Sequence, residues 1–283
     1  LWENGFKDVV IVGGAHNIER LRKLDDEMPM KIDVVEQVDL DAGMQGAVLA
    51  AEDLIKDEPV LIFSSNDVVG EDAFKLVAEA AEKDKDADGF ILAKKVDKYF
   101  PGGYLELDGD GFVTRVVEKP EPGSEPSDLV NLVVHYFREP KILLKYLRKA
   151  ESSNDDLYEK ALDEMILEES KLRAIGYDGY WQAIKYPWHV QEVFRYLFEL
   201  HLAGDEQKIA EGVEISEGAV IEGKVVLDEG VQVMTGAIVK GPCYLGRGTI
   251  VAMNALVRDA NVGESCVIGF STEVARSYLG SNV

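Results

Sequence analysis

The feature that most constrains the fold is a six-residue repeat of aliphatic side chains, which begins at Ile209 and continues almost to the end of the 283-residue chain. The repeated positions are Ile209, Ile215, Ile221, Leu227, Val233, Val239, Leu245, Val251 and Val257, then, after a slip of one residue, Val262, Ile268 and Val274. Neither the helical period of about 3.6 nor the strand period of about two produces this spacing. A triangular prism does, because each flat side takes about one hexad and the aliphatic side chain points to the axis. The sequence therefore predicts a parallel β-helix over residues 205–283.

This pattern resembles the hexapeptide repeat of left-handed parallel β-helix domains, which occur in many acyltransferases and nucleotidyltransferases. The resemblance implies a homo-oligomer, a trimer or a multiple of one, because such prisms commonly pack against one another. The repeat still continues in the last residues, so we expect the β-helix to be incomplete at its C-terminal end.

Residues 1–204 alternate between apolar, strand-like runs and helix-like stretches. The expected strands are 8–12, 31–35, 60–64, 89–93 and 129–136, and the expected helices are 17–25, 47–55, 72–84, 155–167 and 187–203. Near-continuous apolar strands that alternate with helices favour a mostly parallel sheet covered on both faces. Residues 103–118 insert a β-hairpin with Asp-Gly at its turn. We therefore predict an α/β, Rossmann-like domain over residues 1–204, followed by the β-helix.

The chain is strongly acidic, with 53 Asp and Glu against 30 Lys and Arg and a formal charge of −23. This charge repels nucleic acids and anionic membrane surfaces, so both are excluded as partners. A site for a phosphate-bearing substrate must then be locally positive or hold a metal ion. No signal peptide or apolar run of membrane-spanning length (about 18 residues) is present, and two cysteines are too few for a disulfide framework. We expect a cytoplasmic protein.

Four short motifs follow one another in the first domain. They are Glu36-Gln37 with the turn Gly43-Met44-Gln45-Gly46, the strand end at Asp67, the group Gly103, Glu118, Lys119 and Asn131, and the segment around Lys185. A glutamine amide offers both a donor and an acceptor to the edge of a base, and glycines let a ligand approach the backbone closely. An aspartate at the carboxyl end of a parallel strand lies on the ligand-binding rim of the sheet.

In this order the motifs resemble the sugar-1-phosphate nucleotidyltransferase family, of the glucose-1-phosphate thymidylyltransferase and uridylyltransferase type. The family joins a nucleoside triphosphate to a sugar 1-phosphate and releases pyrophosphate. The resemblance implies that these two compounds are the substrates and that Mg²⁺ is the cofactor. It covers nearly the whole chain, because many members carry a hexapeptide-repeat tail.

The resemblance also implies a role for each motif residue. The nucleotide would be bound by Glu36, Gln37, Gly43, Met44, Gln45 and Gly46. The sugar would be bound by Gly103, Glu118, Asn131 and Lys185. Asp67 would hold the metal and Lys119 the sugar phosphate, so these two are the candidate catalytic residues. The motifs do not indicate which base or which sugar is used.

The chain departs from the family pattern at several positions. Asn66, Val133 and Lys185 stand where the family usually has glycine, and Ala183 stands where it has a second metal-binding aspartate. Either Lys185 neutralises part of the charge, or Asp67 and the phosphates alone hold the metal, or the site is impaired. The family's N-terminal, glycine-rich phosphate loop is also missing from these residues, so we expect this chain by itself to be weakly active or inactive.

Two alternative functions remain open. Ala183 and Asn66 motivate a regulatory or scaffolding subunit that binds nucleotide sugar without turnover. A sugar acyltransferase on the β-helix is the other, although such prisms usually use a histidine base and no histidine follows His201. We interpret His135 as a structural residue of its strand, and Trp181 and Trp188 as packing residues.

Overall fold

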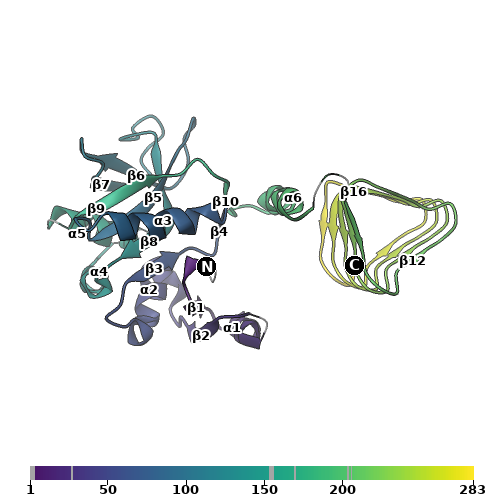
Figure 1. The fold of residues 1–283 in the computed structure, drawn as a ribbon, viewed down its shortest axis with the longest axis horizontal. Coiled ribbons are helices and arrows are strands. Elements are labelled where there is room, and N and C mark those ends of the chain that lie inside the picture. The colour runs from purple at the N-terminus through teal and green to yellow at the C-terminus, as the bar shows by residue number, and fades with distance from the viewer. Residues whose placement is uncertain (1–3, 27, 153–155, 169, 203, 205) are drawn as a thin grey trace. The chain divides into compact units, whose positions relative to one another are not determined.

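The structure is a computed structural model that describes residues 4–26, 28–152, 156–168, 170–202, 204 and 206–283 (Figure 1). Contacts between Cα atoms divide the chain into two compact units, Leu1–Trp181 and Gln182–Val283. The change of period predicted a boundary between residues 204 and 205. The division by contacts falls earlier and groups helix α6 (His189–His201) with the second unit. Among the described residues, no helix is long and apolar enough to cross a membrane.

The first unit contains a six-stranded sheet in the order β7-β6-β8-β5-β9, with β3 also paired to β8. The strands are β3 (Val60–Phe63), β5 (Gly89–Lys95), β6 (Gly103–Leu107), β7 (Val113–Glu118), β8 (Leu129–Phe137) and β9 (Leu172–Gly176). β3 and β5 run antiparallel to β8, and β9 runs parallel to β5, so β3, β5 and β9 share one direction. The predicted α/β class is confirmed, and β8 is the reversed strand between them.

One edge of β8 is shared by two other strands. β5 pairs with β8 from Phe137 to His135 and from Leu132 to Leu129, with a register shift between the two stretches. On the remaining edge, β6 pairs at Val130 and β3 pairs over residues 134–137. Asn131 therefore lies at the junction between β6 and β3.

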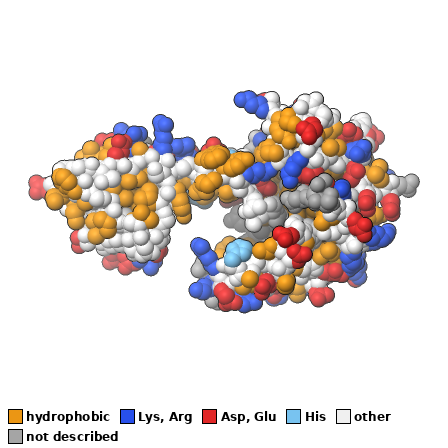
Figure 2. All heavy atoms as spheres, turned by 180° about the vertical axis from the view of Figure 1, so that it is seen from behind, with side chains coloured by type: hydrophobic (Ala, Val, Ile, Leu, Met, Phe, Trp, Pro, Cys, Tyr) orange, Lys and Arg blue, Asp and Glu red, His pale blue; other side chains and the backbone are white. Residues whose placement is uncertain are grey.

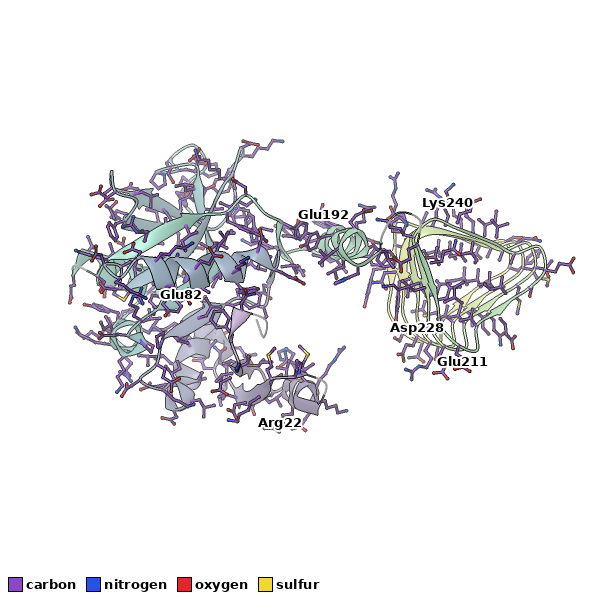
Figure 3. All side chains as sticks on the ribbon, in the orientation of Figure 1. Arg22, Glu82, Glu192, Glu211, Asp228 and Lys240 are labelled. Carbon is purple, nitrogen blue, oxygen red and sulfur yellow. The ribbon has the colours of Figure 1, made fainter. Side chains whose placement is uncertain are left out.

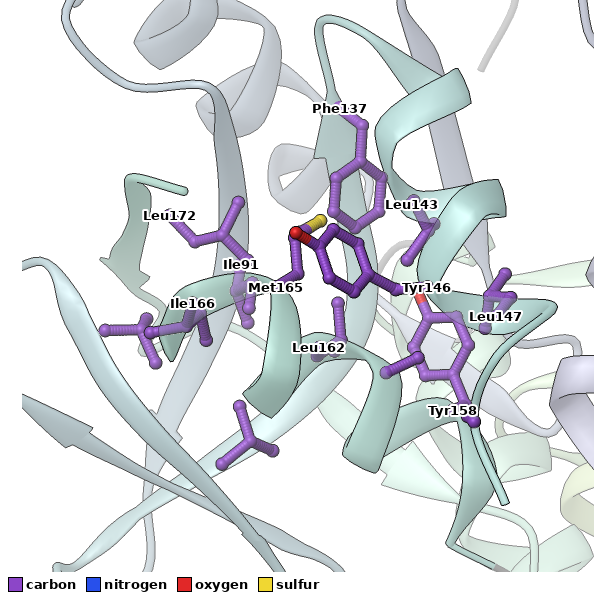
Figure 4. Close-up of a cluster of buried hydrophobic side chains, with 14 of the residues drawn as sticks. Ile91, Phe137, Leu143, Tyr146, Leu147, Tyr158, Leu162, Met165, Ile166 and Leu172 are labelled. Atoms are coloured by element: carbon purple, nitrogen blue, oxygen red, sulfur yellow. The ribbon is translucent and has the colours of Figure 1, made fainter. Parts of the chain in front are cut away.

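Helices cover both faces of this sheet. The buried side chains of α3 (Asp72–Lys83) belong to one core, and those of α4 (Pro140–Leu147) and α5 (Leu157–Leu167) belong to another (Figure 4). Along β5 the side chains alternate between these cores: Phe90 packs with α3, and Ile91 packs with α4 and α5. This alternation is that of a strand buried on both faces.

A two-stranded parallel sheet comes before the six-stranded one in the chain. It pairs β1 (Asp8–Gly13) with β2 (Lys31–Glu36), and α1 (Ile18–Arg22) lies between them in sequence. α2 (Gly43–Ala50) follows and contacts α4 and α5. The remaining short elements before helix α6 are three 3-10 turns and two strands. They are η2 (Lys23–Asp26), η3 (Leu40–Ala42), η4 (Glu52–Leu54), β4 (Asp67–Val69) and β10 (Trp181–Ala183).

Helix α2 begins four residues earlier than the predicted start at residue 47. The 3-10 turn η3 leads directly into it, and the Asp39 side chain caps that turn by accepting a hydrogen bond from the N–H of Asp41 at 3.1 Å. Two glycines of the predicted nucleotide loop, Gly43 and Gly46, therefore lie within the first turns of the helix.

The second unit contains a parallel β-solenoid, as the hexads predicted. Val220 pairs with Ile238 on the next coil, an offset of 18 residues (238 − 220), and after the slip Ile250 pairs with Val267, an offset of 17 (267 − 250). An 18-residue coil is three hexads. The axial side chains from Leu227 to Val262 are fully buried in one continuous core.

The solenoid strands are short, as flat sides of a prism require. They are β11 (Gln207–Ile209), β12 (Glu214–Ile215), β13 (Val220–Glu222), β14 (Val225–Leu227), β15 (Gln232–Val233), β16 (Ile238–Leu245), β17 (Ile250–Val251), β18 (Leu256–Val262), β19 (Val267–Ile268), β20 (Glu273–Ala275) and β21 (Tyr278–Leu279). Charged side chains such as Glu211 and Lys240 project from the solenoid surface (Figure 3).

Helix α6 packs on the outer side of the solenoid. Phe194 and Phe198 form a small hydrophobic cluster with Val226 and Tyr244 of the solenoid strands. Two ion pairs flank this cluster: Arg195 Nε lies 3.0 Å from Asp259 Oδ1, and Lys224 Nζ lies 2.6 Å from Glu199 Oε2. These contacts explain why α6 belongs to the second unit.

Candidate functional site

Three of the predicted sugar-binding residues meet where β6, β7 and β8 adjoin. Gly103 pairs with Glu118, and the next residue of β6, Tyr104, pairs with Val130, which brings Asn131 close to Gly103. A Cβ atom on residue 103 would lie 3.1 Å from Glu118 Oε2 and 3.5 Å from Asn131 Nδ2. The glycine therefore leaves room for a carboxylate and an amide to converge on one point.

Lys119 follows Glu118 with a left-handed backbone (φ 44°) that turns the chain out of β7. Its N–H donates to the carbonyl of Gly102 at 3.0 Å, and its Nζ lies 3.3 Å from Glu118 Oε1. The Glu118 side chain is 12% exposed, whereas that of Lys119 is 46% exposed. The ammonium is thus held beside the predicted sugar-binding residues with access to solvent, a position suited to a phosphate.

A chain of buried polar groups lies behind Asn131. Its Oδ1 is 2.6 Å from Nε2 of His135, and Nδ1 of His135 is 2.8 Å from the hydroxyl of Tyr158. The histidine and tyrosine rings are stacked, with centroids 5.6 Å apart and an interplanar angle of 18°. Burial lowers the pKa of His135 to about 3, an effect that the backbone of Leu132 partly offsets, so the imidazole is neutral at physiological pH.

Four of the predicted nucleotide-binding residues lie together at the end of β2. Glu36 is the last residue of that strand, and Gln37 Nε2 donates to the carbonyls of Asp39 at 2.8 Å and Gly43 at 3.0 Å. A Cβ atom on residue 46 would lie 2.7 Å from Gln37 Nε2. The Gln37 amide thus stabilises the loop through two hydrogen bonds. Gly46 has no side chain, which lets this amide lie close to the helix backbone.

The other two predicted nucleotide-binding residues have structural contacts. Gln45 Nε2 donates to the carbonyl of Leu147 at the end of α4, and Met44 packs against the core formed by α4 and α5. Both contacts anchor α2 to the body of the unit. Their predicted role in nucleotide binding stays a prediction.

Asp67 begins β4, just beyond the carboxyl end of β3. The N–H of Ser64 donates to the carbonyl of Val133 at 3.0 Å, and the N–H of Asp67 donates to the carbonyl of Ser64 at 3.2 Å. This turn therefore lies against the part of β8 that carries Asn131. The Asp67 Oδ1 atom accepts a hydrogen bond from Trp181 Nε1 at 3.0 Å, which fixes the carboxylate.

A second hydrogen-bond network, around the buried Tyr177 side chain, holds the segment after Asp67 in place. The N–H of Gly70 donates to the Tyr177 hydroxyl at 3.0 Å, and that hydroxyl donates to Asp72 Oδ1 at 3.0 Å. Lys94 Nζ donates to the carbonyl of Gly179 at 2.8 Å. These bonds join the Asp67 segment to the one that carries Trp181.

A family model described as nucleotidyl transferase matches residues 1–184. The chain belongs to this family. It is 31% identical over 201 residues to the bifunctional protein GlmU of Methanocaldococcus jannaschii, which covers 70% of this chain and 44% of that protein. It is 26% identical over 226 residues to the bifunctional sugar-1-phosphate nucleotidylyltransferase/acetyltransferase of Sulfurisphaera tokodaii. This alignment covers 79% of this chain and 51% of that protein. The chain spans about half the length of these curated relatives.

Solved structures agree with the fold of this nucleotidyl transferase. UDP-glucose pyrophosphorylase in complex with UDP-glucose aligns with a TM-score of 0.60 at 17% identity, covering 71% of this chain and 84% of that one. Its apo form aligns with a TM-score of 0.59 at 15% identity. At these identities the likeness is one of fold.

The family implies a divalent metal ion. The described residues of this nucleotidyl transferase fit a site in which substrate phosphates supply part of the metal ligands. The described residues contain no group of three or more His, Cys, Asp or Glu that could hold an ion. Mg²⁺ in phosphate-transfer sites is usually bound by one or two carboxylates and by the substrate phosphates. Asp67 at the end of β3 fits such a phosphate-dependent ion, whereas the described residues do not form a closed protein cage.

Two of the predicted positions lie in the second unit. Ala183 is buried, and the N–H of Lys185 donates to His189 Nδ1 at 3.1 Å. The sugar-binding role of Lys185 stays a prediction. The packing role expected for Trp188 is wrong: its side chain is 62% exposed and stacks on Tyr186 with centroids 4.6 Å apart.

His135 and Tyr158 are the site residues that sequence reasoning missed. One signal was present, because Asn131 and His135 are four positions apart in a strand, and an even spacing puts two residues on one face. Tyr158 could not be paired with them from the sequence, because its contact depends on how α5 packs against β8.

The buried histidine predicts a specific loss of stability in acid. The pKa of His135 is about 3 in the folded protein and 6.5 in the unfolded chain, so the unfolded chain binds more protons between these values. The stabilisation is complete above pH 6.5 and is lost as the pH falls toward 3. Between pH 7.5 and 5, wild type should lose about 2 kcal/mol more unfolding free energy than His135→Gln in urea denaturation. Equal losses would contradict a neutral, buried imidazole.

Proposed function

We propose that this nucleotidyl transferase joins a nucleoside triphosphate to a sugar 1-phosphate, giving a nucleotide sugar and pyrophosphate. The observation that carries the proposal is the convergence of Glu118 and Asn131 on Gly103, with the ammonium of Lys119 beside them. A carboxylate and an amide offer an acceptor and a donor to sugar hydroxyls, and the ammonium offers a positive charge to a phosphate. The name of the Sulfurisphaera relative, a sugar-1-phosphate nucleotidylyltransferase, supports the same substrate class.

In this reaction an oxygen of the sugar phosphate attacks the α-phosphorus of the triphosphate in line, and pyrophosphate leaves. Lys119 holds the attacking phosphate, while Glu118 and Asn131 orient the sugar. Gln37 and the loop that it braces hold the base. When bound, Mg²⁺ neutralises charge on the phosphates, and Asp67 is the residue that would hold it. The protein contributes position and charge rather than covalent chemistry.

A pyrophosphate-release assay tests this function directly. UTP, dTTP and GTP would each be combined with glucose 1-phosphate or N-acetylglucosamine 1-phosphate in the presence of Mg²⁺. Turnover with at least one pair is expected, at a low rate with residues 1–283 alone. Isothermal titration with the corresponding nucleotide sugars separates the alternative: binding without turnover of any pair favours a regulatory or scaffolding subunit. Neither binding nor turnover would overturn the proposal.

Replacing Lys119 with alanine should raise the KM for sugar 1-phosphate about 10- to 100-fold, the effect of losing one charge-assisted contact to a phosphate. The KM for the nucleoside triphosphate should change little. Lys95→Ala is a matched control, because Lys95 is 72% exposed and its nearby partner is the surface residue Asp128 at 3.5 Å. An unchanged KM for sugar 1-phosphate in Lys119→Ala would remove this residue from the site.

We also propose that the solenoid supports a homo-oligomer. Hydrophobic side chains are exposed on its surface (Figure 2), namely Val220, Ile238, Met253, Val267, Phe270 and Tyr278. Exposed apolar surface favours contact with another chain. Acetyl transfer is part of the name of the Sulfurisphaera relative, but no observation on this solenoid favours it, and no histidine follows His201 in the 283 residues.

A further inference from the structure

The two ends of the Asn131 amide have different surroundings, and this difference decides what the residue offers to a ligand. Its Oδ1 points to the buried ring of His135, at 2.6 Å from Nε2. Its Nδ2 lies 3.5 Å from the point where a side chain on Gly103 would begin, and Glu118 Oε2 lies 3.1 Å from the same point. A flip of the amide would exchange donor and acceptor at that point.

The proton arrangement of the buried chain follows from its members. An amide oxygen only accepts, so with Oδ1 of Asn131 toward the ring it is Nε2 of His135 that carries the proton facing it. The backbone of Leu132 is a further hydrogen-bond partner of the ring. Because the ring is neutral, Nδ1 is then an acceptor, and the hydroxyl of Tyr158 donates to it at 2.8 Å. Among the described residues, His135 is the hydrogen-bond partner recorded for the Tyr158 hydroxyl. With the amide flipped, Nδ1 would carry the proton and the hydrogen of Tyr158 would lose this acceptor.

Burial makes this arrangement rigid. His135 is fully buried, Tyr158 is 1% exposed, and the two rings are stacked. An unmatched polar group costs most in such a place, because water cannot replace the missing partner. In this arrangement, one orientation of the Asn131 amide satisfies Asn131, His135 and Tyr158 together.

We propose that His135 is a positioning residue, which holds Asn131 with its Nδ2 toward Gly103 and Glu118 and so makes the site select a sugar hydroxyl that accepts from the amide while it donates to the carboxylate. This inference rests on the proposed function, because it assumes that a sugar occupies the space in front of Gly103. It predicts discrimination against a sugar that lacks this one hydroxyl. A polar site built for a hydroxyl rejects the analogue without it strongly, because its own groups are left unpaired.

Two substitutions of His135 test whether the hydrogen bond to Asn131 matters or whether the side chain only fills the core. His135→Gln can place an amide N–H near the position of Nε2 and so still donate to Asn131. His135→Asn is shorter, reaches the position of Nδ1 beside Tyr158, and loses the donor to Asn131. The probes are UDP-glucose and dTDP-glucose with their monodeoxy-sugar analogues, titrated calorimetrically with Mg²⁺ present.

Wild type is expected to bind a parent nucleotide sugar at least 10-fold more tightly than one of its monodeoxy analogues. His135→Asn should lose about 10-fold in affinity for the parent and little for that analogue, whereas His135→Gln should stay within about 3-fold of wild type. If His135→Asn proves unfolded, Tyr158→Phe replaces it and should reduce the same discrimination.

An independent measurement needs no ligand. Nitrogen NMR of the imidazole should show the Nε2–H tautomer of His135 in wild type, with no protonation between pH 7.5 and 5. The Nδ1–H tautomer would overturn the positioning role whatever the protein binds. So would equal discrimination by wild type and His135→Asn. If wild type binds none of the sugar probes, the proposed function itself fails, and the inference with it.

Discussion

Replacing Asp67 with asparagine is expected to lower the rate of pyrophosphate release about a thousandfold, because a metal ion at transferring phosphates is worth several kcal/mol of transition-state stabilisation. The change removes the negative charge that would hold Mg²⁺ and alters little else. The carbonyl oxygen of the asparagine can still accept the Trp181 Nε1 hydrogen bond, which spans 3.0 Å in wild type. The substitution therefore separates the loss of the metal ligand from disruption of the turn.

Two comparisons make the Asp67 result interpretable. Asp128→Asn removes one charge from an exposed carboxylate near Lys95 and should leave the rate within about twofold of wild type. Trp181→Phe removes the indole donor from Asp67 while it keeps an aromatic ring beside Phe100, and it should lower the rate much less than Asp67→Asn. The rate of each variant would be measured across a Mg²⁺ titration. An Asp67→Asn protein with wild-type turnover and wild-type Mg²⁺ dependence would exclude this residue as the metal ligand.

The elements that follow from local periodicity were predictable from the sequence. The hexads placed the axial residues of the solenoid, and the offsets of 18 and 17 residues between paired coils reproduce the slip that the sequence shows after Val257. The hairpin with its Asp-Gly turn pairs β6 with β7, and Gly103 lies opposite Glu118 beyond a register shift at Glu106 and Leu107. In both cases the residues in contact are close in sequence or separated by a fixed repeat, so the sequence itself indicates which residues meet.

Strand β9 shows what local patterns could not predict. Arg173 interrupts its short apolar run, so the segment does not resemble a buried strand. In the structure the guanidinium lies over the Phe112 ring at 4.0 Å and forms an ion pair with Asp84, which lets the strand pair with β5. These partners come from distant parts of the chain, and only the packed structure brings them together.

In the candidate site, too, short motifs identify some residues, whereas other contacts form only between segments that are distant in the sequence. Glu118 and Lys119 were identified because they are adjacent in a recognisable motif. Gln45 belonged to an equally clear motif, but its amide donates to the carbonyl of Leu147 on α4. The sequence pattern predicts only a structural strand residue at His135, because its partner Tyr158 lies on a helix that contacts the strand only after folding. Motifs thus identify candidates, and packing decides which way each side chain faces.

Truncating Leu245 to alanine should destabilise the solenoid by about 3 kcal/mol, within the range for a buried leucine whose neighbours cannot close the cavity. Leu245 is fully buried on the axis and is paired with Leu227 on one neighbouring coil and Val262 on the other. The coils are joined by hydrogen bonds between strands, so they cannot move together to fill the space. Urea denaturation followed by circular dichroism would measure the loss.

Ile215→Ala is the matched control for Leu245→Ala, because Ile215 also lies on a solenoid strand, β12, but is 42% exposed. It should cost no more than about 1 kcal/mol. Since the chain forms two compact units, unfolding can occur in two transitions, and Leu245→Ala should then shift only the transition of the solenoid. Equal costs for the two variants would mean that the axial core does not hold the coils together. A single transition that Leu245→Ala shifts as a whole would instead show that the two units unfold as one cooperative unit.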